Sequence, residues 1–102
     1  MEQPDPDPNP IIHQPVRLKI MSTLKALPAD EMIEFVRLKG LVGATEGNLG
    51  AHLSVLEEAK YVAVEKDFAG KRPRTRVRLT LAGRHAFEDY IAVLKRIIEA
   101  GA

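Results

Sequence analysis

The chain has 102 residues and no cysteine, which excludes disulfide bonds, thiolate nucleophiles and cysteine-based metal sites. Its length fits one domain with a modest core, and no apolar run approaches the roughly 20 residues that span a bilayer. The net charge is only +1, but residues 69–79 hold five basic and no acidic side chains, so the rest of the chain sums to −4. Such a basic segment is typical of a phosphate-binding element, although a solvated hairpin tip would show the same composition.

The first ten residues, MEQPDPDPNP, alternate proline with acidic and amide side chains. Proline donates no backbone hydrogen bond and this segment has little apolar surface to bury, so residues 1–10 are predicted to form a disordered tail before one domain over 11–102. The tail also lacks the charged-then-apolar layout of a signal peptide, and we expect a cytoplasmic location. Ile11 and Ile12 follow abruptly and are expected to dock on a partner subunit.

Two helices are predicted before residue 44. Pro15 suits a first helical turn and Pro28 stops a helix, which places the first helix over 15–26. A short strand is possible around 32–34. Apolar side chains at helical spacing then predict a short second helix ending near Gly43, namely Phe35, Leu38, Leu41 and Val42.

A third helix is predicted from Thr45, a good N-cap, to about residue 59. Its inward row is Leu49, Leu53 and Leu56, and its other face shows Asn48, Ala51, His52 and Val55. Two short helices joined by a glycine-bearing turn are the layout of a helix-turn-helix.

The hydrophobic period changes to two after residue 60, which predicts a β-hairpin. Its first strand covers 61–68, and breakers at 70–73 form the turn. In the second strand, apolar or hydroxyl side chains alternate with Arg74, Arg76 and Arg78. The hairpin tip and one hairpin face are therefore basic.

A long last helix is predicted after its cap, Thr80, with an apolar stripe wider than one small domain needs to cover. Such a helix either packs against a second subunit as well as its own domain, or is fully buried within its own domain. A chain of this size offers few elements that could bury it completely. We therefore predict a two-fold homodimer. Its expected interface residues are Ile11, Ile12, Phe87, Tyr90, Ile91, Leu94, Ile97 and Ile98.

This order of elements predicts an α+β, mainly α, winged helix-turn-helix with a three-helix core, a β-hairpin wing and a long C-terminal helix. The stretch GNLGAHLSVLEEAKYVAVEKDFAGKRPRTRVRLTLAGRHAFEDY resembles the recognition helix, wing and last helix of small transcriptional regulators similar to the MarR and ArsR groups. PVRLKIMSTL resembles their first helix, and the resemblance covers residues 11–98. Two departures stand out: Lys60 replaces a glycine often found there, and Gly47, Gly50 and Ala51 make the exposed helix face small.

The resemblance implies that the helix over 45–59 enters the major groove of double-stranded DNA and that the wing over 68–76 contacts the backbone or minor groove. The residues expected to contact DNA are Thr45, Glu46, Asn48, Ala51, His52, Lys71, Arg72, Arg74 and Arg76. Asn48 can offer its amide to a base edge, whereas packing against the turn explains His52 equally well. We expect a homodimeric transcriptional regulator, and a repressor rather than an activator, because no segment resembles a polymerase-recruiting element.

Two other functions fit the sequence. One is a winged-helix module that binds a protein through its apolar last helix; the other is a regulator whose dimer interface holds a small effector lined by Tyr90 or Phe35. No enzyme is expected, because neither a serine-histidine-acid arrangement nor a phosphate loop is present. No cofactor is predicted, and His85 with Glu88 or Asp89 would make only a weak metal site.

Overall fold

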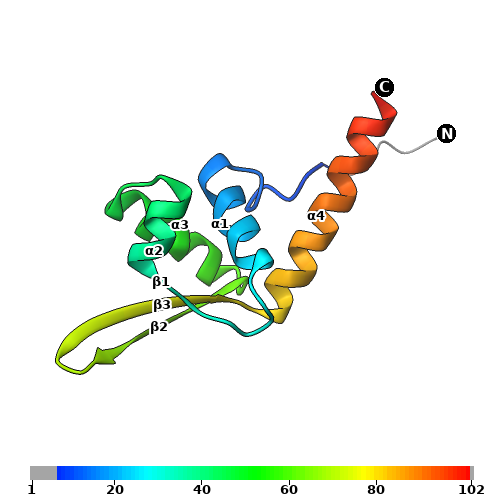
Figure 1. Ribbon diagram of the computed structural model, residues 1–102. Coiled ribbons are helices and arrows are strands. Elements are labelled where there is room, and N and C mark those ends of the chain that lie inside the picture. The colour runs from blue at the N-terminus through cyan, green and yellow to red at the C-terminus, as the bar shows by residue number, and fades with distance from the viewer. Residues whose placement is uncertain (1–6, 102) are drawn as a thin grey trace.

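Residues 7–101 are described by a computed structural model, which contains four helices and one small sheet with the helices on one side of it (Figure 1). The elements in chain order are α1 (Pro15–Ala26), β1 (Ile33–Glu34), α2 (Phe35–Val42), α3 (Glu46–Glu58), β2 (Val62–Ala69), β3 (Arg72–Leu79) and α4 (Leu81–Ala100). The first three helices cluster over one face of a long β2–β3 hairpin, and α4 begins at the base of that hairpin, at the end opposite its tip, and projects away. This is the predicted winged helix-turn-helix. No helix among the described residues is long and apolar enough to cross a membrane.

The helix boundaries are set by N-cap side chains and by a glycine, which the sequence predicts. The Thr45 hydroxyl accepts a hydrogen bond from the Asn48 backbone N–H at 3.2 Å, and the Thr80 hydroxyl accepts one from the Gly83 N–H at 2.9 Å. Each bond satisfies a backbone donor that the first helical turn leaves unpaired. At the other end of α2, Gly43 has φ +68°, the left-handed conformation that glycine adopts without a side-chain clash. Both predicted caps and the predicted end of α2 are confirmed.

The sheet is antiparallel with strand order β1-β3-β2, and its two faces differ in chemistry. The β2–β3 register pairs Val62 with Leu79 and Val64 with Val77. These side chains face the helices, and Val62 and Val77 are fully covered. Because neighbouring strand residues point to opposite faces, the arginines of β3 lie on the sheet face that turns away from the helices.

One apolar core joins all four helices to the sheet. The predicted row Leu49, Leu53 and Leu56 is buried, as is Leu38 of α2. The prediction for Leu41 is wrong, because that side chain is 59% exposed. The buried core consists of Ile12, Ile20, Met21, Leu24, Ile33, Leu38, Val42, Leu49, Leu53, Leu56, Val62, Val77, Leu79, Phe87 and Tyr90.

The base of the hairpin and the start of α4 are in close backbone contact. A Cβ atom on Gly83 would overlap the Tyr61 carbonyl group, lying 2.8 Å from its carbon, and would lie 2.9 Å from Cδ1 of Leu79. Lys60, just before this point, has φ +69°, a conformation that costs a non-glycine residue about 1–2 kcal/mol. The glycine that the resembled families often carry at this position fits that backbone without strain.

The segment before α1 is the main difference from the sequence prediction. Residues 1–6 of the expected disordered tail lie outside the described residues, but Asn9 is tied to the domain: its Nδ2 donates to the Tyr61 hydroxyl at 3.0 Å, and its Oδ1 accepts from the Ile11 N–H at 2.9 Å. Ile12, expected at a subunit interface, has no exposed surface. The segment folds back onto its own chain because Ile12 completes the core.

Two of the expected interface residues on α4 also belong to the core. Phe87 is 8% and Tyr90 is 1% exposed, and the Tyr90 hydroxyl lies 2.8 Å from Nδ1 of His13. The prediction that Ile12, Phe87 and Tyr90 contact a second subunit is therefore wrong. The first half of the apolar stripe on α4 packs against its own domain. Only the apolar side chains in the second half of α4 therefore remain as candidates for a subunit interface.

Candidate nucleic-acid interface

The first turns of α3 present a small, polar surface to solvent. Thr45, Glu46, Asn48 and Ala51 are all exposed, while the leucine row beneath them holds the helix on the core. All four of these predicted contact residues are therefore exposed near the start of α3, with Asn48 and Ala51 on its outer side and Glu46 on the side that faces the hairpin. Because the helix N-terminus carries unpaired N–H groups and a partial positive charge, this end of α3 suits an anionic or hydrogen-bond-accepting partner.

His52, the fifth residue predicted on this helix, is half-buried at the border between α3 and α1. Its Nδ1 lies 3.1 Å from a terminal nitrogen of the Arg17 guanidinium, whose Nε donates to the Ile11 carbonyl oxygen. Burial, together with the positive charge of Arg17, lowers the pKa of His52 below its ordinary value of 6.5. The imidazole is therefore neutral at physiological pH, and its orientation is fixed from within the protein.

The four hairpin cations that the sequence predicts to contact DNA fall into two groups. Lys71 stands at the exposed tip, and Arg72 beside it keeps 73% of its side chain exposed despite a loose 3.7 Å ion pair with Glu34. Arg74, by contrast, makes a two-pronged contact with Asp67, Nε to Oδ1 and a terminal nitrogen to Oδ2, both at 2.9 Å. Arg76 also donates to Asp67 Oδ2 at 2.9 Å.

The sequence predicts that all four of these cations contact DNA, but the structure gives the two pairs different surroundings. Arg74 and Arg76 are held by the carboxylate of Asp67 on the sheet face that turns away from the helices, whereas Lys71 and Arg72 stay exposed at the tip. The positive field available to a ligand beside α3 is therefore concentrated at the tip of the hairpin.

Asp67 should make part of the stability pH-dependent. The hydrogen bond from Arg74, with the charges of Arg74 and Arg76, lowers the pKa of Asp67 to about 2 from its ordinary 3.8. Since the folded-state value lies below the unfolded one, the stabilisation is complete above about pH 4 and is lost as the pH falls through about 2. In urea unfolding between pH 5 and pH 2, we expect wild type to lose more stability than Asp67→Asn. Parallel pH profiles of the two proteins would contradict this assignment.

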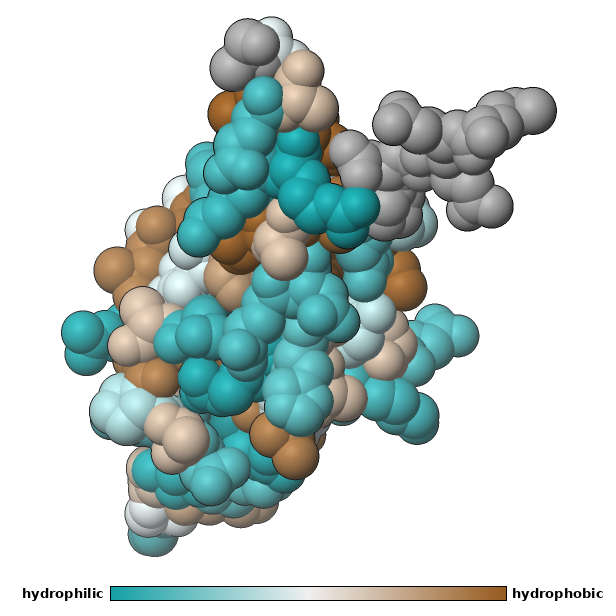
Figure 2. Space-filling view, turned by 90° about the vertical axis from the view of Figure 1, so that its right-hand side faces the viewer, coloured by the Kyte–Doolittle hydropathy of each residue, from teal (hydrophilic) through white to brown (hydrophobic). Residues whose placement is uncertain are grey.

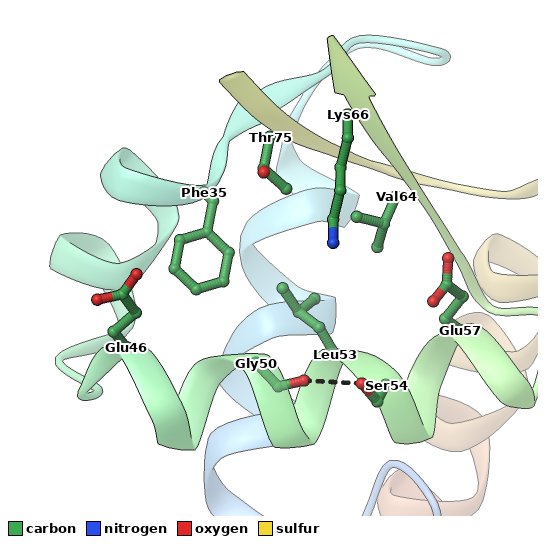
Figure 3. A pocket seen from close by; sticks show the side chains of 9 residues that line it. All are labelled: Phe35, Glu46, Gly50, Leu53, Ser54, Glu57, Val64, Lys66 and Thr75. Atoms are coloured by element: carbon green, nitrogen blue, oxygen red, sulfur yellow. Dashed lines mark hydrogen bonds between the residues drawn. The ribbon is translucent and has the colours of Figure 1, made fainter. Parts of the chain in front are cut away.

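A groove runs between α3 and the inner face of the hairpin (Figure 3). Lys66 and Thr75 point into it from the strands, while Glu46 and Glu57 stand at its two ends along α3. Two carboxylates against one amine do not favour a phosphate in the groove. Phe35 also lines this groove, whereas Tyr90, the other side chain expected to line an effector site, lies at a separate pocket.

Sequence reasoning missed three residues at this surface: Arg17, Asp67 and Lys66. Counting outward from a two-residue turn at Gly70 and Lys71 places Asp67 opposite Arg74, so the strand register carried that signal. The same alternation puts Lys66 on the inner face. No local pattern announces Arg17, because its contact with His52 joins residues 35 positions apart.

Known proteins share sequence similarity with most of this chain. A family model described as a winged helix DNA-binding domain covers residues 16–98. An uncharacterized protein from Methanocaldococcus jannaschii is 40% identical over 81 residues, which span 79% of this chain and 85% of that protein.

Solved structures show the same similarity. A transcriptional regulator homologue from Pyrococcus horikoshii OT3 superposes with a TM-score of 0.79 at 33% identity, covering 88% of this chain and 86% of that one. A MarR-family transcriptional regulator from Silicibacter pomeroyi shares the fold, with a TM-score of 0.67 at 20% identity over 84% of this chain and 55% of that one.

The predicted fold is confirmed, and so is the prediction that the chain is not an enzyme, because the matched family is non-enzymatic. The capped helix over a leucine row and the basic-tipped hairpin, together with a family match over most of the chain, lead to one assignment. The chain belongs to the family of winged helix DNA-binding domains and has the fold of MarR-type transcriptional regulators.

Proposed function

We propose that this protein is a sequence-specific regulator of transcription that places α3 in the major groove of double-stranded DNA. The observation that carries the proposal is the exposed, small and polar face formed by Thr45, Asn48 and Ala51 on a helix that the core holds rigidly. Small side chains let the helix backbone approach the groove floor, and the Asn48 amide can pair with the acceptor and donor of an adenine edge.

The hairpin tip supplies affinity in this proposal. The hairpin tip extends beyond the helices (Figure 1), and its exposed Lys71 and Arg72 can neutralise backbone phosphates or enter the minor groove. Phosphate contacts position a protein on the duplex without reading its sequence, and base contacts in the major groove then select the site. The two cations and α3 thus divide affinity and specificity between them.

The experiment is selection of bound duplexes from a random DNA pool at moderate salt, followed by titration of wild type and Asn48→Ala on the selected duplex. We expect enrichment of a defined motif, and weaker binding by Asn48→Ala with relaxed preference at one base pair, a change of roughly 1–3 kcal/mol. Recovery of random sequence, or equal discrimination by both proteins, would contradict the proposal.

We also propose that the protein acts as a homodimer through the second half of α4. Ile98 is 68% and Ile97 is 40% exposed, and Ile91 and Leu94 line a groove with α1. Figure 2, which looks onto α4, shows hydrophilic residues down the middle of this face and hydrophobic residues gathered along its side. A second copy related by a two-fold axis would cover this side and would set two α3 helices about one DNA turn apart, giving a roughly palindromic site.

The dimer is tested by charging one end of α4 at a time. Ile98→Glu should give a monomer of 11.3 kDa by light scattering after gel filtration, because burying a carboxylate in an apolar interface is unfavourable. Leu81→Glu is the matched control, since Leu81 is 70% exposed at the opposite end of α4, and this variant should remain dimeric. Equal masses for the two variants would contradict the assignment of the interface to this end.

We further propose that bound dimer represses transcription, because occupancy of a promoter is sufficient to exclude polymerase. Transcription in vitro from a promoter carrying the selected motif should decrease as the protein is added, and an increase would contradict repression. The alternative is a winged helix that binds another protein through α4, and the exposed Ile97 and Ile98 favour it. A stable heteromeric complex together with no binding to selected or random DNA would establish that alternative.

A further inference from the structure

A chain of hydrogen bonds links the N-terminal segment to α3. Ile12 is buried in the core, and the carbonyl of the neighbouring Ile11 accepts a hydrogen bond from Arg17 Nε. A terminal nitrogen of the same guanidinium lies 3.1 Å from His52 Nδ1. The planar guanidinium is thus fixed at two points, one in the segment before α1 and one on α3.

The chemistry of arginine decides the direction of the second bond. A guanidinium has five N–H donors and no acceptor, so Arg17 must donate and His52 Nδ1 must accept with its lone pair. A neutral imidazole carries one proton, which is then on Nε2. The lowered pKa of His52 agrees with a neutral ring.

The free end of the ring is available to a ligand. His52 Nε2 has no hydrogen-bond partner among residues 7–101, and the one buried side-chain polar atom without a partner in that range is Nε of Arg76. Nε2 is therefore reached by solvent. It belongs to the same helix as Asn48, one turn further along.

We infer that Arg17 is a positioning residue that fixes His52 in the Nε2–H tautomer, so that α3 presents a hydrogen-bond donor, and not an acceptor, to DNA. The inference rests on the proposed DNA-binding function. A donor at this position recognises an acceptor on the duplex, either a purine N7 in the major groove or a phosphate oxygen. Without Arg17, the ring would be able to exchange between a donating and an accepting Nε2.

The first test uses the free protein and does not depend on DNA. Nitrogen-15 shifts of the His52 ring at pH 7.5 should show a protonated Nε2 and an unprotonated Nδ1. Arg17→Leu should shift the ring toward a mixture of tautomers, whereas Arg17→Lys, which keeps a donor, should retain the Nε2–H form. A protonated Nδ1 in wild type, or the same spectrum in wild type and Arg17→Leu, would overturn the inference and leave the proposed function intact.

The second test is a double-mutant cycle on the selected duplex. His52→Phe should weaken binding about tenfold and Arg17→Leu by a smaller factor, because a fraction of its His52 rings keeps the donating tautomer, and the double variant should bind no more weakly than His52→Phe, because Arg17 acts through His52. Lys25→Leu removes one positive charge at the far end of α1 and should bind like wild type. Additive losses would show that Arg17 contacts DNA itself and would overturn its positioning role.

Modified duplexes distinguish the two acceptors. If His52 reads a base, replacing the contacted purine by its 7-deaza analogue weakens wild type but not His52→Phe; if it contacts the backbone, a neutral methylphosphonate has that effect instead. Either result supports the inference, and full sensitivity of His52→Phe to both changes overturns it. If wild type binds no duplex at all, the proposed function fails, while the ring spectra still decide the tautomer.

Discussion

Gly83→Ala is expected to lower the free energy of unfolding by about 3 kcal/mol, a loss at the upper end for overpacking by one methyl group. The new Cβ would overlap the carbonyl of Tyr61, which is backbone and cannot rotate away as a side chain would. That carbonyl also accepts the Thr80 N–H at 3.0 Å, so moving it disturbs the start of α4. Urea unfolding followed by circular dichroism measures the change.

Gly50→Ala is the matched control for this substitution. Gly50 also lies within a helix, but a Cβ there meets nothing within 4 Å. Alanine is favoured over glycine inside a helix by about 1 kcal/mol, so Gly50→Ala should unfold at higher urea than wild type. A Gly83→Ala protein as stable as Gly50→Ala would contradict the close approach between Tyr61 and α4.

Removing the two cations of the hairpin tip is the second change with a large expected effect. Lys71→Gln with Arg72→Gln should weaken binding to selected and random duplexes alike, by about tenfold or more, because phosphate contacts carry no sequence information. Each lost phosphate contact lowers the slope of log affinity against log salt by about 0.9, so the slope should flatten by roughly 2 per protomer. Fluorescence anisotropy titrations at several salt concentrations measure both quantities.

The control removes the same charge one step further from the tip. Arg74→Gln with Arg76→Gln takes away two arginines that Asp67 already holds. We expect a much smaller change in affinity and salt slope from this pair. Equal effects of the two double variants would mean that DNA contacts the outer face of the hairpin as well as its tip.

Sequence patterns predicted the elements of this fold because each boundary is a local event. Thr45 and Thr80 cap helices through bonds to residues three positions away, and Gly43 ends α2 through its own backbone conformation. The row from Leu49 to Leu56 lies at helical spacing on a short, one-sided helix, so its inward direction follows from the pattern alone.

The errors arose where long-range packing decides the outcome. An apolar stripe on α4 predicts that the stripe is buried, but it does not say whether the same chain or a second subunit buries it. Phe87 and Tyr90 were therefore predicted to contact a second subunit, although their own domain buries them. Ile12 was misplaced for the same reason. The pairing of Arg17 with His52 and the close contact at Gly83 depend on how segments meet in space, and no spacing in the sequence encodes them.

The central claim is that the first turns of α3 and the tip of the hairpin together form the surface that contacts DNA. The most direct measurement is titration of nitrogen-15-labelled protein with the selected duplex, following each backbone amide. We expect the largest shifts at residues 45–52 and 70–72, with small shifts along the second half of α4. Shifts confined to α4 and absent from residues 45–52 would contradict the claim.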